Sequence, residues 1–249
     1  MKKILLEINN LKKNYHNKKN EIEAIDNLNF SVYENEILAI VGPSGCGKST
    51  LLSILSNQDK PSSGKIIKNK ELSIGYMLQS DSLFPWLTVK ENALLPMEIK
   101  KQKTEENIKN VMNLFKKYGL QDFISMYPNN LSGGMRQRVA LIRTLSFNPN
   151  LLLLDEPYSA LDYQTRLALS NDLYNIIKQE GKTAILITHD IAEAISLADR
   201  VIVLSKRPCT VKNIYDIKLE NKTNPIDNRK DPKFYYYYDL IWRDLDVHI

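Results

Sequence analysis

The hydrophobic positions form short continuous runs separated by longer amphipathic stretches. Apolar runs at 37–41, 151–154, 183–188 and 200–204 have the length of buried strands. Apolar residues with the spacing of helices are found at 51–55, 163–180 and 191–197. Because strands that alternate with helices are typical of a mainly parallel sheet covered by helices, the pattern predicts an α/β fold.

The start of the chain has a different pattern. Residues 4–11 and 25–33 mix apolar and polar positions as half-buried strands do, and a polar loop rich in Lys and Asn is predicted between them, reaching to about residue 23. Two further short strands are predicted at 65–67 and 72–78.

The middle of the chain reads as helical. From 80 to about 127 glycine nearly disappears, and residues 107–118 carry their apolar side chains on one helical face. We therefore predict a helical subdomain over 80–147, inserted between core segments 1–79 and 148–216.

The last segment, 217–249, is predicted to be a C-terminal extension. The aromatic run 234–238 and the apolar residues after it favour a packed terminal helix over a binding function. The chain ends too soon after the last core strand for an added regulatory barrel, so no large sensory domain is expected.

The segment from Gly42 to Thr50, GPSGCGKST, lies between a predicted strand and a predicted helix. Its glycines let successive N–H groups point inward, and the helix N-terminus adds partial positive charge, so the loop is predicted to hold a polyphosphate. Lys48 would reach the β- and γ-phosphates, and the Ser49 hydroxyl would bind Mg²⁺. A glycine-rich turn without a ligand is the alternative, and the strand–loop–helix context disfavours it.

Polar residues follow two of the predicted buried strands. Asp155 and Glu156 come directly after one strand, at the edge where ligands of open α/β sheets bind. Asp155 would hold Mg²⁺ through water, and Glu156 would orient or deprotonate the attacking water. His189 ends another strand and is placed to contact the γ-phosphate. The alternative for the Asp-Glu pair is that both are surface carboxylates at a strand end without a functional role. The other two histidines, His16 and His248, are predicted to be solvated.

A second glycine-containing helix start lies at Leu131-Ser132-Gly133-Gly134, directly before a predicted helix. Its serine and paired glycines are more elaborate than a simple cap and indicate another anion-binding site. A single nucleotide needs only one such phosphate-binding segment. The helix start at Ser132 is therefore predicted to bind the nucleotide of a neighbouring subunit. Tyr15, upstream of the phosphate loop, is a candidate to stack on a base, with a tyrosine packed at a strand end as the alternative.

Composition restricts the location and the partners. The chain of 249 residues is 43% hydrophobic and 25% charged, which is typical of a soluble globular protein. Its net charge of +5 comes from scattered lysines, so nucleic acid is not indicated as a partner. Glu7 interrupts the short apolar run after the first two lysines, so no export signal is expected, and no apolar stretch is long enough to span a bilayer. Cys46 and Cys209 cannot form a disulfide framework, which favours a reducing compartment.

Together these segments resemble the ATP-binding cassette family over nearly the whole chain. GPSGCGKST is similar to its Walker A motif, LSGGMRQR to its signature sequence, LLLLDEP to its Walker B motif, and Ser159-Ala160-Leu161-Asp162 to its D-loop. Gln79 resembles the glutamine of its Q-loop, His189 its switch histidine and Tyr15 its adenine-stacking aromatic residue. Asn35 departs from the family pattern, where glycine is usual, and is expected to affect only a turn.

The resemblance implies a P-loop NTPase fold, with a RecA-like core sheet, an N-terminal antiparallel β region and an inserted helical subdomain. It implies an ATPase with ATP and Mg²⁺ as cofactors, working as a head-to-tail homodimer. The implied catalytic residues are Glu156, His189, Gln79 and Lys48, and the implied metal ligands are Ser49, Gln79 and Asp155. The implied ATP contacts are Tyr15, Gly42, Ser44, Gly45, Cys46, Gly47, Lys48, Ser49, Thr50, Ser132, Gly133, Gly134 and Asp162.

A narrower resemblance concerns residues 79–89, which contain Pro85-Trp86. This segment looks like the Q-loop of ATPases from nitrate, sulfonate and taurine importers, and subunits that import thiamine precursors share it. The resemblance implies a subunit at the cytoplasmic face of the cell membrane, bound to an integral membrane permease and served indirectly by an extracytoplasmic solute-binding protein. The transported substrate is not fixed by it.

Three alternatives stay open at this point. An exporter subunit is disfavoured by the Pro-Trp segment. A soluble cassette acting on ribosomes or DNA usually has two cassettes or long coiled coils, and this chain has neither. A P-loop kinase or GTPase is disfavoured by the LSGG segment and the D-loop.

Overall fold

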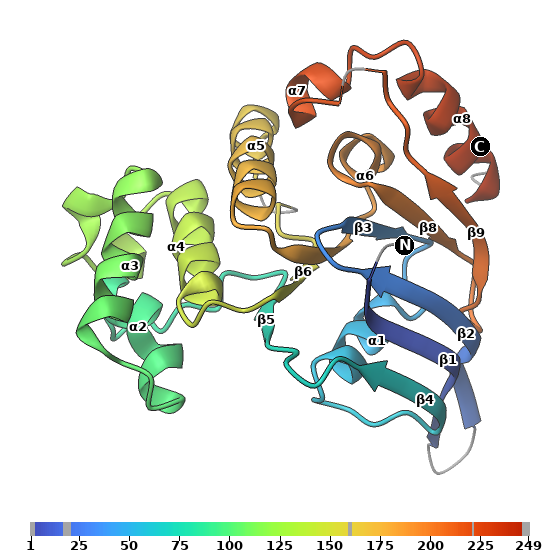
Figure 1. Ribbon diagram of the computed structural model, residues 1–249, viewed down its shortest axis with the longest axis horizontal. Helices are drawn as coiled ribbons and strands as arrows, with labels where there is room; N and C mark the ends of the chain where they lie inside the picture. The colour runs from blue at the N-terminus through green and yellow to red at the C-terminus, as the bar shows by residue number, and fades with distance from the viewer. Residues whose placement is uncertain (1–2, 17–20, 159–160, 221, 246–249) are drawn as a thin grey trace.

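The computed structural model describes residues 3–16, 21–158, 161–220 and 222–245, which form two sheets with helices packed between and beside them (Figure 1). The strands are β1 (Ile4–His16), β2 (Glu21–Tyr33), β3 (Ile37–Val41), β4 (Ser63–Lys68), β5 (Ile74–Met77), β6 (Leu151–Asp155), β7 (Thr183–Ile187), β8 (Arg200–Leu204) and β9 (Val211–Asp216). The α-helices are α1 (Lys48–Leu55), α2 (Val89–Ile99), α3 (Glu105–Lys117), α4 (Gly133–Leu145), α5 (Tyr163–Gln179), α6 (Ile191–Leu197), α7 (Pro225–Asn228) and α8 (Phe234–Asp244).

The larger sheet has six strands in the order β5-β6-β7-β3-β8-β9. All neighbours pair in parallel except β9, which lies antiparallel to β8 at the edge. Every residue of β3, β6, β7 and β8 is buried, which explains why these strands appear in the sequence as continuous apolar runs. The predicted α/β fold with a mainly parallel sheet is therefore confirmed, although β9 was not predicted.

Alternate residues of this sheet enter two hydrophobic cores. Leu38 and Ile40 face α1 and the smaller sheet, whereas Ile37, Ala39 and Val41 face the side of α5, α6 and α8. Both faces of the sheet are thus covered, and its functional groups lie at the strand ends.

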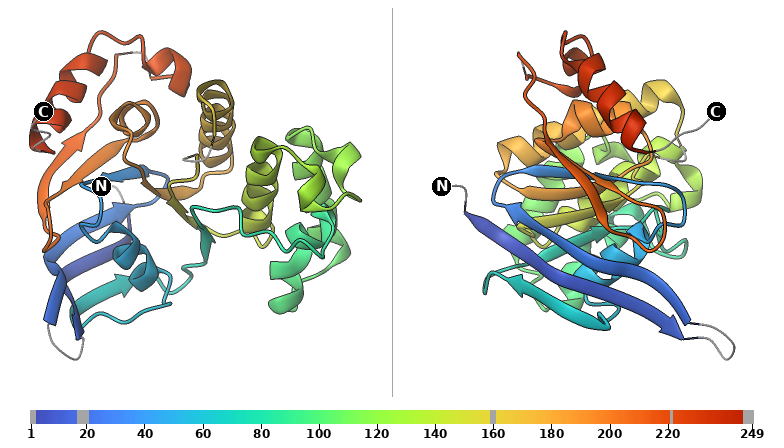
Figure 2. Two further views of the ribbon diagram at one scale, coloured as in Figure 1. Left: turned by 180° about the vertical axis from the view of Figure 1, so that it is seen from behind. Right: turned by 90° about the vertical axis from the view of Figure 1, so that its right-hand side faces the viewer.

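The smaller sheet is antiparallel, with the strand order β2-β1-β4 (Figure 2). Its first strand is longer than predicted. The expected loop after residue 11 is wrong, because the polar residues up to His16 continue to pair with β2, with Tyr15 opposite Ile22. Side chains on the solvent-exposed face of a strand can be polar. The polar composition of residues 12–16 therefore did not indicate that β1 extends to His16.

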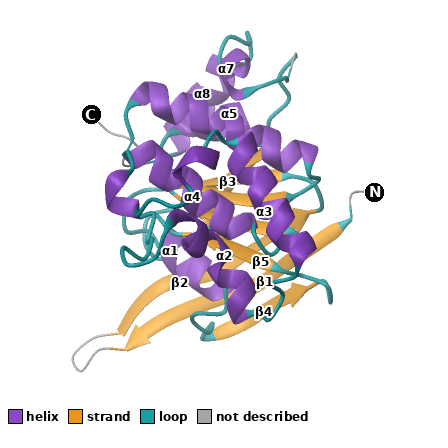
Figure 3. Cartoon of the chain, turned by 90° about the vertical axis from the view of Figure 1, so that its left-hand side faces the viewer, coloured by secondary structure: helices purple, strands orange, loops and turns teal. Residues whose placement is uncertain are grey.

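Helices α2, α3 and α4 gather in a group beyond the edge of the larger sheet (Figures 2 and 3). They share a core to which Val111 and Phe115 contribute. Arg143 ties α4 to the segment after β5 through hydrogen bonds to the carbonyls of Asp81 and Ser82, each 2.7 Å long. The division of the chain at 80 and 147 remains a prediction.

The predicted terminal helix is present as α8. Phe234 and Ile241 are buried against the larger core, while Tyr235 and Tyr236 are exposed. Within the part of the chain that the structure describes, no helix combines the length and the apolar character that crossing a membrane requires.

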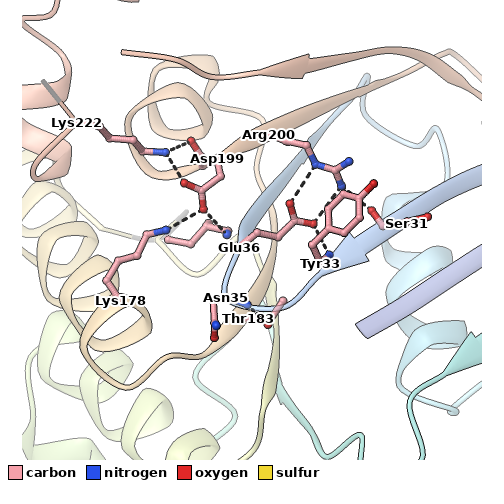
Figure 4. Close-up of polar contacts among 11 residues, drawn as sticks. Ser31, Tyr33, Asn35, Glu36, Lys178, Thr183, Asp199, Arg200 and Lys222 are labelled. Atoms are coloured by element: carbon pink, nitrogen blue, oxygen red, sulfur yellow. Dashed lines mark hydrogen bonds and ion pairs between the residues drawn. The ribbon is translucent and has the colours of Figure 1, made fainter. Parts of the chain in front are cut away.

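Charged residues fix the starts of β3 and β8 (Figure 4). Arg200 donates two hydrogen bonds of 3.1 Å to the Glu36 carboxylate, and both side chains are almost fully buried. Beside them, Asp199 accepts from Lys178 and Lys222 at 2.8 Å each and from the backbone N–H of Ile37.

Asn35 stands in the turn before β3 with φ 61, a left-handed conformation that asparagine tolerates better than most residues. Its backbone N–H donates to the Thr183 hydroxyl at 2.9 Å. The expectation that this residue concerns only a turn agrees with its position.

Candidate functional site

The loop from Gly42 to Gly47 joins the end of β3 to the start of α1. Its backbone requires glycine at position 47, where φ is +131 and an added Cβ would come within 3.0 Å of the Ala24 carbonyl oxygen. Because β3 pairs in parallel with β7 and β8, the ends of these strands lie at the same edge of the sheet as the loop. The sequence therefore builds a phosphate-binding loop at the edge where a nucleotide is expected.

Lys48 is the first residue of α1 and is 8% exposed. Its Nζ donates hydrogen bonds to the carbonyls of Gly42 at 2.7 Å and Pro43 at 2.9 Å. These bonds keep the ammonium group at the loop, within the site that the sequence assigned to the phosphates.

A pocket of about 310 Å³ opens over the loop. Its lining residues are Ser44, Gly45, Gly47, Lys48, Ser49, Thr50, Glu156 and Arg207. Seven of these were predicted site residues. Gly42 and Cys46 are buried within the loop and do not line the pocket, so any contact they make with a nucleotide would come from their backbone.

Arg207 is the lining residue that sequence reasoning missed. It follows β8, and its Nη2 donates a 2.6 Å hydrogen bond to the Gly45 carbonyl. The strand β8 was predicted correctly, but its position next to β3 was not, and only that pairing places residue 207 beside the phosphate loop. Knowledge of the strand order would have identified it.

The predicted carboxylates lie at the end of β6. Asp155 is 8% exposed, and its Oδ2 accepts a 3.4 Å hydrogen bond from the Tyr76 hydroxyl. Burial raises the pKa of Asp155, and the neighbouring Glu156 carboxylate raises it further. A cation at this position would relieve both effects.

Glu156 has φ 44, which is unusual for a residue with a side chain, and its N–H donates to the Ile187 carbonyl at 2.9 Å. This backbone turns the side chain toward two other predicted residues. Glu156 Oε2 lies 3.3 Å from Gln79 Nε2 and 3.1 Å from His189 Nδ1. A carboxylate held beside an amide and an imidazole in this way can orient a water molecule and accept its proton.

The donor set fits Mg²⁺. Magnesium takes oxygen ligands and usually keeps several waters in addition to one or two protein groups and substrate phosphates. The Ser49 hydroxyl lines the pocket, and the buried Asp155 carboxylate has the charge that such an ion requires. Among the described residues, no group of three or more His, Cys, Asp or Glu side chains forms a closed metal cluster.

The second predicted phosphate site is the start of α4. The Ser132 hydroxyl caps this helix by accepting from the Met135 N–H at 3.3 Å. An added Cβ at Gly134 would come within 2.7 Å of Thr165 on α5, so the backbone approaches its neighbour closely there. Ser132, Gly133 and Gly134 do not line the pocket of their own chain.

Asp162 caps α5 by accepting from the Thr165 N–H at 3.0 Å, and this backbone hydrogen bond lowers the pKa of Asp162. Ser159 and Ala160, the first half of the predicted D-loop, lie outside the described residues.

Tyr15 lies within β1, where it is 41% exposed. Its hydroxyl donates a 3.0 Å hydrogen bond to Asp59, and it does not line the pocket. Stacking on a base therefore stays a prediction for this residue.

This chain is similar to known proteins in both sequence and architecture. Residues 25–159 match the family model described as ABC transporter. An uncharacterized ABC transporter ATP-binding protein of Bacillus subtilis is 42% identical over 248 residues, covering 97% of this chain and 95% of the relative. An aliphatic sulfonates import ATP-binding protein of Bacillus cereus is 38% identical, covering 85% of this chain and 86% of the relative.

The fold is also similar to the dimeric structure of an ATP-binding cassette in a post-hydrolysis state, bound to ADP and Pi. The TM-score is 0.75 at 33% sequence identity, and the match covers 86% of this chain and 99% of the solved chain. With a phosphate loop at one strand end and the Glu156, Gln79 and His189 cluster beside it, the chain belongs to the ABC transporter family and is an ATP-binding, ATP-hydrolysing cassette.

Proposed function

We propose that this cassette is the ATPase subunit of an importer for a small solute, of the sulfonate or nitrate class or of the thiamine-precursor class. The observation that carries the proposal is the segment after Gln79, which presents exposed aromatic side chains next to a catalytic candidate. Trp86 is 70% exposed and packs against Phe84 with ring centroids 5.2 Å apart. The similarity to the aliphatic sulfonates import ATP-binding protein of Bacillus cereus supports the same assignment.

The aromatic segment is rigidly held. The buried Asn92 side chain accepts from the Phe84 N–H at 2.8 Å and donates to the carbonyls of Phe84 and Leu87 at 3.0 Å each. Thr88 and Glu91 form a capping box at the start of α2. An exposed tryptophan whose segment is held in place by the buried Asn92 side chain is suited to bind a partner protein. We propose that Trp86 contacts the permease.

In the proposed reaction, Lys48 and the N–H groups of the phosphate loop hold the phosphates, and Glu156 orients water and accepts its proton. Ser49, Asp155 and Gln79 would hold Mg²⁺, and the ion would neutralise charge on the phosphates. His189 keeps the Glu156 carboxylate in place and faces the departing phosphate.

We further propose a head-to-tail dimer, in which Ser132 and Gly134 of one subunit close over the nucleotide on Lys48 of the other. This arrangement gives a role to the helix start at Ser132, which is predicted to bind an anion but does not line the pocket of its own chain. ATP binding would close the dimer, hydrolysis would reopen it, and the permease would place the subunit at the cytoplasmic face of the membrane.

The test is affinity capture of a tagged Glu156→Gln form from detergent-solubilised source membranes with ATP and Mg²⁺. Recovery of a polytopic permease in stoichiometric amount, with a solute-binding protein, supports the importer. A permease without a binding protein favours an exporter, and ribosomal or DNA-bound proteins instead of a permease contradict the proposal.

Two further variants locate the contact. Trp86→Ala in the same background is expected to lose the permease. Tyr235→Ala is the matched control, because Tyr235 is 72% exposed and lies on α8, away from α2. Equal recovery with both variants would contradict the role given to Trp86.

A further inference from the structure

The two cysteines of the chain lie close together at the phosphate loop, although they are distant in sequence. Cys46 lies within the loop and Cys209 two residues after Arg207, and both are free, 2% and 0% exposed. The side chains of Cys46 and Cys209 interact directly, and each shifts the pKa of the other. An added Cβ at Gly47 would lie 3.3 Å from Cys209 Cβ, so the segment around Cys209 touches the loop itself.

Cys209 has a fixed backbone. Its N–H donates to the Ala24 carbonyl and its carbonyl accepts from the Asp26 N–H, each at 3.0 Å. The Ser205 hydroxyl, bonded to the Pro208 carbonyl and accepting from the Thr210 N–H, braces the same turn. The backbone on the Cys209 side is therefore held in place, and we expect the approach of the two sulfur atoms to move the phosphate loop.

We propose that Cys46 and Cys209 form an oxidation site, at which an oxidant of the peroxide class joins the two thiols in a disulfide and thereby blocks ATP binding. The inference rests on the proposed role of the loop in holding the nucleotide phosphates. A disulfide requires the sulfur atoms to approach to about 2.05 Å, closer than two thiols that are not covalently linked. Because Gly45 and Gly47 on either side of Cys46 both line the pocket, this movement displaces groups that would hold the phosphates.

The surroundings favour oxidation at Cys46. The interaction with the Cys209 side chain, helped by the charge and backbone N–H of Lys48, lowers the pKa of the Cys46 thiol to about 6 against the opposing effect of burial. The same interaction and burial raise the pKa of Cys209. Because the pKa of Cys46 is lowered and that of Cys209 is raised, we assign the first oxidation step to Cys46 and the second to Cys209.

The chemistry balances with hydrogen peroxide as oxidant. The Cys46 thiolate attacks one peroxide oxygen, the O–O bond breaks, and the departing hydroxide becomes water by taking a proton, which leaves a sulfenic acid on Cys46. The Cys209 sulfur then attacks the Cys46 sulfur, the S–O bond breaks, and the hydroxyl leaves as water with the Cys209 proton. Two thiols lose two electrons and one peroxide becomes two waters, and a dithiol reductant reverses the change.

The test uses the purified full chain, reduced and then treated with hydrogen peroxide in the presence or absence of ATP. Peptide mass spectrometry without reduction is expected to find the Cys46 and Cys209 peptides linked. ATP affinity is expected to fall at least tenfold and to return with dithiothreitol, and bound ATP is expected to slow the linkage because it covers the loop.

Cys209→Ala is the control, because it removes the second thiol without adding a polar atom to a buried position. It is expected to bind ATP as the reduced parent does and to keep that affinity after mild peroxide treatment. Failure of the linkage, linkage with unchanged ATP affinity, or equal inactivation of the control would overturn the proposal. Failure of the reduced parent to bind ATP would instead contradict the proposed function.

Discussion

His189 Nδ1 lies 3.1 Å from Glu156 Oε2, although the two residues come from the ends of different strands. The parallel pairing of β6 with β7 brings them together, since it places Asp155 opposite Ile187. The left-handed backbone of Glu156 then turns its carboxylate toward the imidazole, and such strain is typical of functional residues.

The Glu156 carboxylate is expected to be needed for hydrolysis and not for binding. Glu156→Gln keeps the shape of the side chain but cannot accept a proton, so the rate of phosphate release should fall by about 100-fold or more while ATP affinity is retained. Steady-state phosphate release and equilibrium ATP binding measure the two effects. Glu71→Gln, an exposed site outside the pocket, is the control, and an undiminished rate in Glu156→Gln would remove Glu156 from its proposed role.

The proposed shared site predicts an asymmetry in mixed dimers. If Lys48 of one subunit works with Ser132 of the other, Lys48→Ala and Ser132→Ala on opposite chains leave one intact site. The same two changes on one chain, paired with an unchanged partner, damage both sites. Phosphate release by differently tagged, purified mixed dimers should therefore be higher for the opposite-chain arrangement, and the reverse order would show that each site lies within one chain.

The sequence was sufficient where a local pattern determines the structure. The buried strands, the loop before α1 and the helix start after Ser132 depend on neighbours in sequence, and all were predicted. The extension of β1 to Tyr15, the edge strand β9 and the position of Arg207 depend on pairing between distant segments. Periodicity carries no information on such pairing, which explains why these features were missed.

Arg207 is expected to contribute to nucleotide binding. Its guanidinium lines the pocket and holds the Gly45 carbonyl, so Arg207→Ala removes a positive charge and loosens the phosphate loop. Because the side chain is exposed, ATP affinity should fall only by about threefold to tenfold. Titration with a fluorescent ATP analogue at low and high salt measures the change.

Lys206→Ala is the matched control for this variant, since Lys206 is an exposed neighbour that does not line the pocket. Equal affinities of Arg207→Ala and Lys206→Ala would contradict a specific role for Arg207.

Loss of one partner of the buried Arg200–Glu36 pair should destabilise the fold more than loss of both partners. Arg200→Met removes the guanidinium that faces the Glu36 carboxylate, which is 3% exposed, and should lower the free energy of unfolding by about 3 to 5 kcal/mol. The double variant Arg200→Met and Glu36→Gln should recover part of this loss. Urea unfolding measures both, and a double variant less stable than Arg200→Met would argue against an uncompensated charge as the cause.

Glu193 should make stability depend on pH in the neutral range. It is 4% exposed on α6, its Oε2 accepts from the Thr188 hydroxyl, and its Oε1 has no hydrogen-bond partner among the described residues. Burial raises the pKa of Glu193 from 4.5 to about 7, and the nearby Asp190 adds to this shift. Because the folded protein then binds the proton more tightly than the unfolded chain, the stabilisation is complete below pH 4.5 and is lost as the pH rises through 7.

Glu193→Gln is neutral at every pH and should lose this dependence. The variant is therefore expected to gain stability relative to the parent between about pH 5 and about pH 8.5, by an amount on the order of 2 to 3 kcal/mol. Urea unfolding at both pH values measures the difference. Glu220→Gln, which removes an exposed carboxylate near Lys233, should change stability by less than about 1 kcal/mol at either pH. A difference between Glu193→Gln and the parent that stays the same at both pH values would show that Glu193 does not titrate in this range.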